Sequence, residues 1–169
     1  MVQVNVSSGD IARVEADALV TAINSGGMWF GGIDGVIQRC AGGQFHQQAS
    51  AAAPLEDGKT VVARGKPHKG AFRNVVFVVD DLQRPLREVV LAGLRAADEA
   101  GFKTVTLPTI RMGVMLGAVE KTVQKAVEEM VAAVTAFKDN ASSVESVTFV
   151  VYNDDNTQRL LADALLPAN

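Results

Sequence analysis

Residues 17–37, with the sequence DALVTAINSGGMWFGGIDGVI, contain the three pieces that decide the fold. The first seven residues form an almost continuous apolar run, which is typical of a parallel strand covered on both faces. A glycine-rich loop follows, and beyond it the spacing of Val36, Ile37 and Cys40 predicts a helix with one apolar stripe. The segment therefore predicts a sheet strand that leads into a helix through a glycine loop.

The same alternation continues along the rest of the chain. Runs rich in β-branched and apolar residues predict further strands at 2–6, 59–64, 74–79, 103–107 and 146–152. Apolar residues at helical spacing predict helices over 34–48, 85–99, 118–137 and 156–166. Alternating strands and helices indicate the α/β class, so we expect a three-layer α-β-α sandwich around a central mixed, largely parallel sheet of about six strands.

Size and composition narrow the class of protein. The 169 residues are 48% hydrophobic, and we expect them to form a single domain over 1–169 with its own core. The formal net charge of −3 argues against a nucleic acid as the partner. The sequence has no leader pattern and no apolar run of about 20 residues, so we expect a cytoplasmic protein that does not contact membranes. We also expect it to be a monomer. Its single Cys40 cannot form an internal disulfide and is expected to pack inside.

Open α/β sheets bind ligands beyond the carboxyl ends of their strands, in the loops that lead into helices. Three loops are placed in this way: the glycine loop after strand 17–23, PTIRMGVMLGA at 108–118 and YNDDN at 152–156. The first two contain glycine, and each leads into a predicted helix whose backbone N–H groups and dipole favour an anion. Two such loops predict a diphosphate held between them.

At these loops the chain resembles the macro domains, a family that binds ADP-ribose. Four segments carry the resemblance and occur in the family's order: GDIARVEADALVTAIN at 9–24, GGIDGVIQRCAG at 31–42, LPTIRMGVMLG at 107–117 and FVVYNDD at 149–155. The resemblance implies the macro domain fold and, as partner, ADP-ribose or an ADP-ribosylated protein, without a cofactor or a metal. The two histidines, at positions 46 and 68, are too isolated in the sequence for a metal site.

The resemblance assigns the adenine end of the ligand to two of these segments. Asp10 would accept a hydrogen bond from the adenine amino group, Ile11 would line the pocket, and Tyr152 would stack on the adenine face. Without the resemblance, Asp10 is a turn or cap residue after Ser-Ser-Gly, and Tyr152 is a tyrosine of the core. The sequence leaves both interpretations open.

The two glycine loops would hold the diphosphate and the distal ribose. The residues implied are Gly31, Gly32, Ile33, Arg111, Met112, Gly113, Val114 and Met115. At Arg111, Met112 and Gly113 the chain departs from the family, where Ser-Thr-Gly is common. Arg111 either adds a charge-assisted contact to a phosphate or points outward.

Further departures surround the distal ribose. Thr21 replaces a common Asn, Gln38 replaces a common His, and Met115 stands where the family often places an aromatic residue. Trp29 and Phe30 of the first loop would replace that aromatic lid, packing against the sugar and excluding water. The alternative is that both side chains fold back onto the core of the protein.

Asp34 and Asn24 are the catalytic candidates that the resemblance implies. In the hydrolytic branch of the family, an Asp here positions or activates a water for attack at C1″ of the distal ribose or on an ester of that ribose, which Asn24 would contact. Without the resemblance, Asp34 is an acid favoured by the helix dipole, and Asn24 is a turn residue. The predicted function is ADP-ribose binding with hydrolysis of mono-ADP-ribosyl esters on acidic residues or of O-acetyl-ADP-ribose. The alternatives are a non-catalytic ADP-ribose reader and a binder of another nucleotide.

Overall fold

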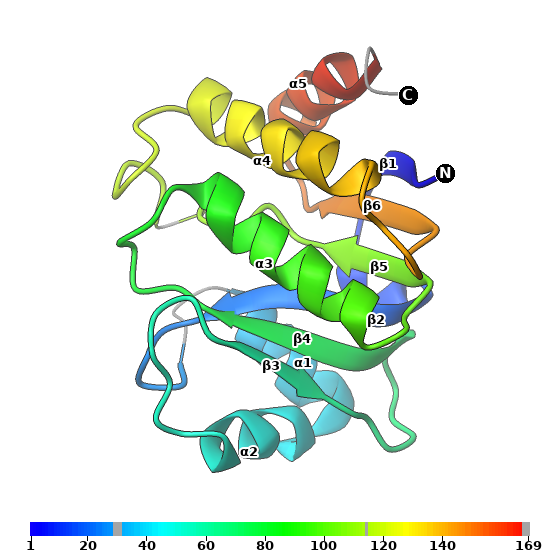
Figure 1. Cartoon of the computed structure of the whole chain (residues 1–169), viewed down its shortest axis with the longest axis vertical. Helices are drawn as coiled ribbons and strands as arrows, with labels where there is room; N and C mark the ends of the chain where they lie inside the picture. Colours follow the sequence, from blue (N-terminus) through cyan, green and yellow to red (C-terminus); the bar gives the residue numbers. More distant parts are fainter. Residues whose placement is uncertain (29–31, 114, 167–169) are drawn as a thin grey trace.

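A computed structural model describes residues 1–28, 32–113 and 115–166 and places a six-stranded sheet at the centre of the molecule (Figure 1). The strands are β1 (Gln3–Ser8), β2 (Ala16–Ile23), β3 (Thr60–Ala63), β4 (Phe72–Val79), β5 (Thr104–Leu107) and β6 (Ser146–Val151). Their order is β1-β6-β5-β2-β4-β3, and every neighbouring pair is parallel except β3 with β4. The expected α/β sandwich with a mixed, mostly parallel sheet is confirmed.

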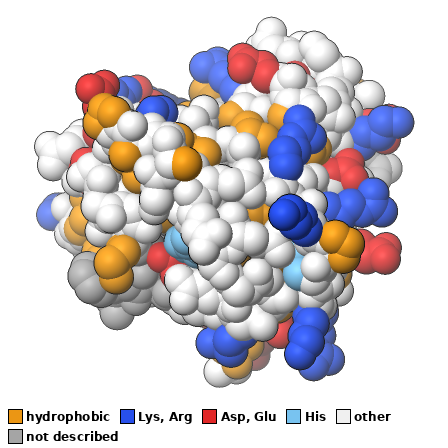
Figure 2. Space-filling view, turned by 90° about the horizontal axis from the view of Figure 1, so that it is seen from below, with side chains coloured by type: hydrophobic (Ala, Val, Ile, Leu, Met, Phe, Trp, Pro, Cys, Tyr) orange, Lys and Arg blue, Asp and Glu red, His pale blue; other side chains and the backbone are white. Residues whose placement is uncertain are grey.

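Helices cover both faces of this sheet. They are η1 (Ile11–Arg13), α1 (Gly32–Ala41), α2 (Gln44–Ala51), α3 (Leu86–Glu99), α4 (Val123–Lys138) and α5 (Asp155–Leu165). The helices α3, α4 and α5 share one hydrophobic core with the sheet, and η1, α1 and α2 share the other (Figure 1). In the described part of the chain, no helix combines the length and the apolar character needed to cross a bilayer. Basic and acidic side chains are interspersed on the face seen in Figure 2.

The strand β2 shows how the sequence builds three layers. Side chains alternate between the faces of a strand, so Ala18 and Val20 point into the core shared with α3 and α4, while Leu19 and Ile23 point into the core shared with α1 and α2. All four side chains are fully buried. The apolar run of β2 is therefore continuous because both of its faces lie under helices.

Two helices differ from the sequence prediction. The segment 34–48 is not one helix, because α1 ends at Ala41 and Gly42 takes a positive φ of 63° that a helix cannot continue. The helix predicted over 118–137 begins only at residue 123, where the Thr122 side chain accepts a hydrogen bond from the N–H of Lys125. The residues before it remain in the turns of the second ligand loop.

Candidate functional site

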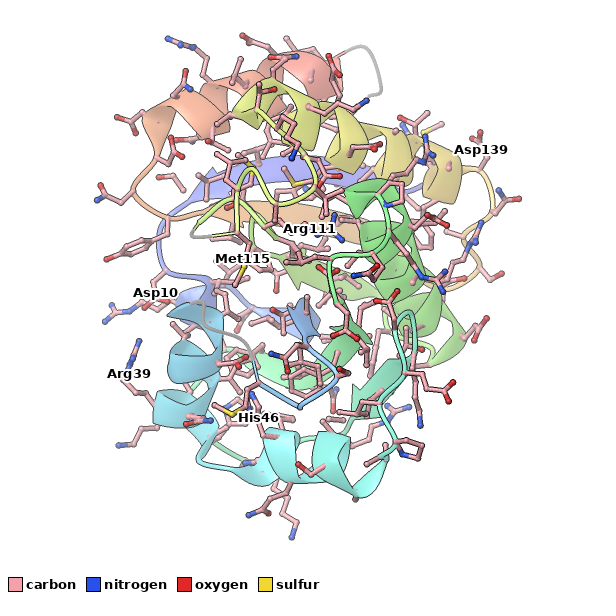
Figure 3. The ribbon with its side chains drawn as sticks, turned by 90° about the vertical axis from the view of Figure 1, so that its left-hand side faces the viewer. Asp10, Arg39, His46, Arg111, Met115 and Asp139 are labelled. Carbon is pink, nitrogen blue, oxygen red and sulfur yellow. The ribbon has the colours of Figure 1, made fainter. Side chains whose placement is uncertain are left out.

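A cleft of about 500 Å³ lies at the carboxyl edge of the parallel strands. The segments that follow β1, β5 and β6 line it together with the end of β2 and one face of α1, as expected for an open α/β sheet. In the view of Figure 3, Met115 of the second loop lies between Asp10 and Arg111, and Arg39 projects from α1. The volume of the cleft is within the range of small-molecule sites, roughly 300–1,000 Å³.

The predicted adenine residues come together at one end of this cleft. Asp10, Ile11 and Tyr152 all line it. The Asp10 side chain also caps η1, since Oδ1 accepts a hydrogen bond of 2.9 Å from the N–H of Ala12. Tyr152 is 76% exposed, so the alternative of a core tyrosine is wrong. The hydrogen bond from Ala12 shows that the cap interpretation of Asp10 is correct. It does not exclude a ligand, because the same residue lines the cleft.

The first glycine loop is described only up to Met28 and again from the first residue of α1. Gly32 and Ile33, both predicted from the sequence, line the cleft at the start of that helix. Trp29, Phe30 and Gly31 lie outside the described residues, so the aromatic lid stays a prediction.

The helix α1 adds residues to the cleft that the sequence analysis did not select. Val36 and Arg39 line it together with Ile33, because residues three apart share one face of a helix. The motif GGIDGVIQRCAG carries this spacing, so the signal was present in the sequence. Thr21, noted above only as a departure from the family, is 3% exposed and also lines the cleft.

The second loop contains two corrections. Met112 packs against the core formed with α3 and α4 and is not among the residues that line the cleft. Gly113 and Met115 do line it, and Val114 lies outside the described residues. Neither alternative for Arg111 is right, because its side chain is only 1% exposed and points into the protein, although the residue borders the cleft.

The guanidinium of Arg111 is held by two buried carboxylates. Nε and Nη2 donate to the two oxygens of Asp80 at 2.9 and 2.7 Å, and Nη1 donates to Oε1 of Glu120 at 2.8 Å. A further bond of 2.7 Å runs from Nη2 to the carbonyl oxygen of Arg84. Burial disfavours the charged form, but the hydrogen bonds to Asp80 and Glu120 outweigh it and raise the pKa of Arg111 above its ordinary value. Four of the five N–H groups of this cation are thus engaged within the protein, which leaves little capacity for a phosphate.

Neither predicted catalytic residue is among those that line the cleft, although Asp34 directly follows the lining residue Ile33. Oδ1 of Asn24 accepts hydrogen bonds from the N–H groups of Gly26 and Met28, at 2.9 and 3.1 Å, and thereby shapes the first loop. Asp34 stands in the first turn of α1, and its Oδ1 lies 3.3 Å from Nε2 of His46 on α2. The contact between His46 and Asp34 is not apparent from the sequence, because the two residues belong to different helices.

Comparison with known proteins finds relatives of this chain. Residues 20–126 match the family model described as Macro domain. An O-acetyl-ADP-ribose deacetylase of Enterobacter sp. (strain 638) is 34% identical over 167 residues, which cover 92% of this chain and 90% of that protein. A macro domain-containing protein of Lactiplantibacillus plantarum is 29% identical over 178 residues, covering 98% of this chain and 97% of that protein.

Solved structures share the fold at lower sequence identity. The Trypanosoma brucei macrodomain in complex with ADP-ribose superposes with a TM-score of 0.81 at 19% identity, covering 96% of this chain and 68% of that one. The Oceanobacillus iheyensis macrodomain with ADP superposes with a TM-score of 0.76 at 18% identity, covering 96% and 90%. These two likenesses concern the arrangement of strands and helices.

Proposed function

The chain belongs to the macro domain family, and on that premise we propose that its residues 1–169 form one macro domain that binds ADP-ribose in the cleft. The observation that carries the proposal is the position of the cleft. One end of the cleft carries the acidic side chain of Asp10 and the aromatic ring of Tyr152. The amino end of α1, at Gly32, also lines the cleft. An adenine fits the first end, and a diphosphate fits the second because a helix amino terminus attracts anions.

At the adenine end, each residue has a distinct task. The exposed ring of Tyr152 offers a face for stacking, and the partly exposed carboxylate of Asp10 offers acceptor sites for an amino group. Oδ1 of Asp10 already accepts one hydrogen bond, from Ala12, and a carboxylate oxygen can accept two. The buried side chain of Ile11 supplies an apolar wall beside them.

At the diphosphate end, we propose that the main chain of the two glycine loops supplies the contacts. Gly32 and Ile33 are the first residues of α1, where backbone N–H groups have no partner within the helix. Gly113 of the second loop lines the same cleft, and among the described residues other than its chain neighbours a Cβ at this glycine would meet no atom within 4 Å. The open space beside Gly113 supports an approach of the phosphates to the second loop.

We propose further that the protein hydrolyses mono-ADP-ribosyl esters of acidic residues or O-acetyl-ADP-ribose, with Asp34 activating the water and Asn24 contacting the distal ribose. The similarity to curated O-acetyl-ADP-ribose deacetylases supports this activity. The position of Asp34 directly after the cleft-lining Ile33 supports it as well. A carboxylate accepts the proton of an attacking water and favours developing positive charge on the sugar.

A reader that binds ADP-ribose without turnover is the second candidate. One observation favours it: Oδ1 of Asn24 is engaged by two main-chain N–H groups of its own loop, which leaves less acceptor capacity for a ribose. A binder of another nucleotide is the third candidate and would use the same cleft.

Calorimetry tests the binding. Tyr152→Ala should weaken the binding of ADP-ribose by about 1–2 kcal/mol, roughly 5- to 30-fold in Kd, because the adenine loses its aromatic stacking partner. Tyr152→Phe keeps the ring and serves as the matched control. Titrations with ADP, ATP and NAD separate ADP-ribose from other nucleotides. Equal affinity of the Ala and Phe variants, or no heat with ADP-ribose at millimolar concentration, would contradict the assignment of the cleft.

Turnover is measured separately with O-acetyl-ADP-ribose and with a peptide ADP-ribosylated on glutamate. Asp34→Ala should abolish hydrolysis and leave ADP-ribose affinity within about a factor of three, as expected for a group used only in the transition state. A wild-type protein that binds ADP-ribose but releases no product from either substrate is a reader.

A further inference from the structure

His46 is a partly buried ionisable side chain that the proposed function does not yet use. It comes from α2, and only 14% of its side chain is exposed. Its ring packs on Phe77 of β4, with 5.2 Å between the ring centroids. Its Nε2 lies 3.3 Å from Oδ1 of Asp34, whose side chain is 13% exposed. An imidazole from one helix is thus placed against a carboxylate from another, in a largely dry environment.

From this contact we propose that His46 is a positioning residue for Asp34, an inference that rests on the proposed hydrolysis. A neutral imidazole carries one N–H, and the nitrogen that faces a carboxylate is the one expected to hold it. The 3.3 Å contact is not aligned as a hydrogen bond in the structure, but with the proton on Nε2 a small rotation of the ring would let it donate to Oδ1 of Asp34 and fix the direction of the carboxylate at the amino end of α1. The packing on Phe77 holds the donor in place.

The arrangement requires the break between α1 and α2. Gly42, with its positive φ, ends α1, and Gly43 precedes the first residue of α2. The chain turns there, so that His46, twelve positions after Asp34, comes back against the first turn of α1. One uninterrupted helix would carry two residues so far apart about 18 Å along its axis and could not bring them together.

A fixed carboxylate matters for the proposed chemistry because a general base works only within hydrogen-bond reach of the water it deprotonates. A displacement of about 1 Å can lower a rate about 100-fold while leaving the folded structure intact. His46 therefore should affect the rate of hydrolysis much more than the affinity for ADP-ribose.

Three variants separate the hydrogen bond from the packing. His46→Phe keeps an aromatic ring against Phe77 but has no donor, and His46→Gln restores an N–H donor with a similar reach. His68→Gln is the matched control. The other histidine of the chain, His68, packs on Phe45 and Phe72, and its Nδ1 accepts from the N–H of Gly70. It does not line the cleft.

We expect His46→Phe to lower kcat for O-acetyl-ADP-ribose about 10- to 100-fold with KM and the calorimetric Kd for ADP-ribose nearly unchanged. His46→Gln should recover at least half of that loss on a logarithmic scale, and His68→Gln should match the wild type. An active wild type with an equally active His46→Phe variant overturns the inference and leaves the proposed function standing. So does a His46→Gln variant that is folded and as slow as His46→Phe.

Nitrogen NMR of the imidazoles gives a readout that does not depend on turnover. The chain has two histidines, so the spectrum contains two rings, and His68→Gln assigns them. We expect His46 to carry its proton on Nε2 in the wild type and to become a mixture of tautomers in Asp34→Ala. A proton on Nδ1 in the wild type overturns the hydrogen bond itself. A wild type without hydrolytic activity overturns the proposed hydrolysis and the catalytic role of the pair together, whatever the tautomer.

Discussion

Removing the Arg111 guanidinium should destabilise the protein by several kcal/mol without any direct loss of a ligand contact. The side chain is 1% exposed, and its two carboxylate partners are also buried, with Asp80 at 0% and Glu120 at 4%. Arg111→Met keeps most of the volume but leaves both carboxylates buried without their cation. Breaking a buried ion pair by removing one partner typically costs about 3–5 kcal/mol, because the remaining charge is uncompensated.

Urea unfolding followed by circular dichroism at pH 7 measures this cost. A loss of about 3–5 kcal/mol corresponds to a fall in Tm of roughly 6–20 °C for a domain of this size. The control is the triple variant Arg111→Met, Asp80→Asn, Glu120→Gln, which removes all three charges. Its amides keep acceptor oxygens for the N–H groups of Leu82 and Leu86, which now donate to Asp80 and Glu120.

The two variants decide between charge and packing as the cause. If uncompensated charge is the main cost, the triple variant should be more stable than Arg111→Met alone, since replacing a whole buried ion cluster is often close to neutral. An Arg111→Met protein within about 1 kcal/mol of the wild type would refute the reasoning, because that is the range of exposed ion pairs. A triple variant as unstable as the single one would show that lost packing dominates.

Two further predictions concern stability. Burial would raise the pKa of Asp98, but hydrogen bonds from the N–H groups of Val144, Ser142 and Ser143 lower it below its ordinary value. The contribution of Asp98 to the free energy of unfolding is therefore complete above the ordinary carboxyl pKa of about 3.9, and it is lost as pH falls through the lower pKa of the folded state. Asp98→Asn should cost about 1–3 kcal/mol at pH 7. It should also flatten the acid limb of the curve of stability against pH. Gly93→Ala would place a Cβ of α3 against the Val20 side chain of β2 and should cost about 1–3 kcal/mol in a urea titration; an unchanged midpoint would show that α3 can shift away.

The fold was predictable because its signals are local. The apolar run at 17–23 needs no knowledge of distant residues to indicate a strand covered on both faces, and β2 is buried in this way. The boundaries were less predictable, since α1 ends through the backbone conformation of Gly42 and not through any loss of apolar spacing. The choice of Asp10 and Tyr152 came from the resemblance to macro domains, and the structure brings them to one cleft because they lie within two residues of the carboxyl ends of β1 and β6, which are neighbouring parallel strands.

The contacts that the sequence could not predict are those between side chains far apart in the chain. Arg111 is 31 residues from Asp80, and no local pattern joins them. His46 and Asp34 are closer in sequence, but their contact depends on a turn between two helices that the periodicity of 34–48 conceals. In both cases the sequence shows only the residues next to a charged or titratable side chain, whereas its contacts in the folded protein come from another element.

Arg111 also explains how the second loop tolerates the loss of the common Ser-Thr-Gly. Its φ of 66° is a left-handed conformation that costs a residue with a Cβ about 1–2 kcal/mol, so glycine would be easier there. The cost is smaller than the loss expected when its ion cluster is broken, about 3–5 kcal/mol. The partner Asp80 also donates its main-chain N–H to the carbonyl of Ile23, the last residue of β2, at 2.7 Å. Through Asp80, one buried cluster therefore connects the second loop to the base of the first, and a change at position 111 should disturb both sides of the cleft.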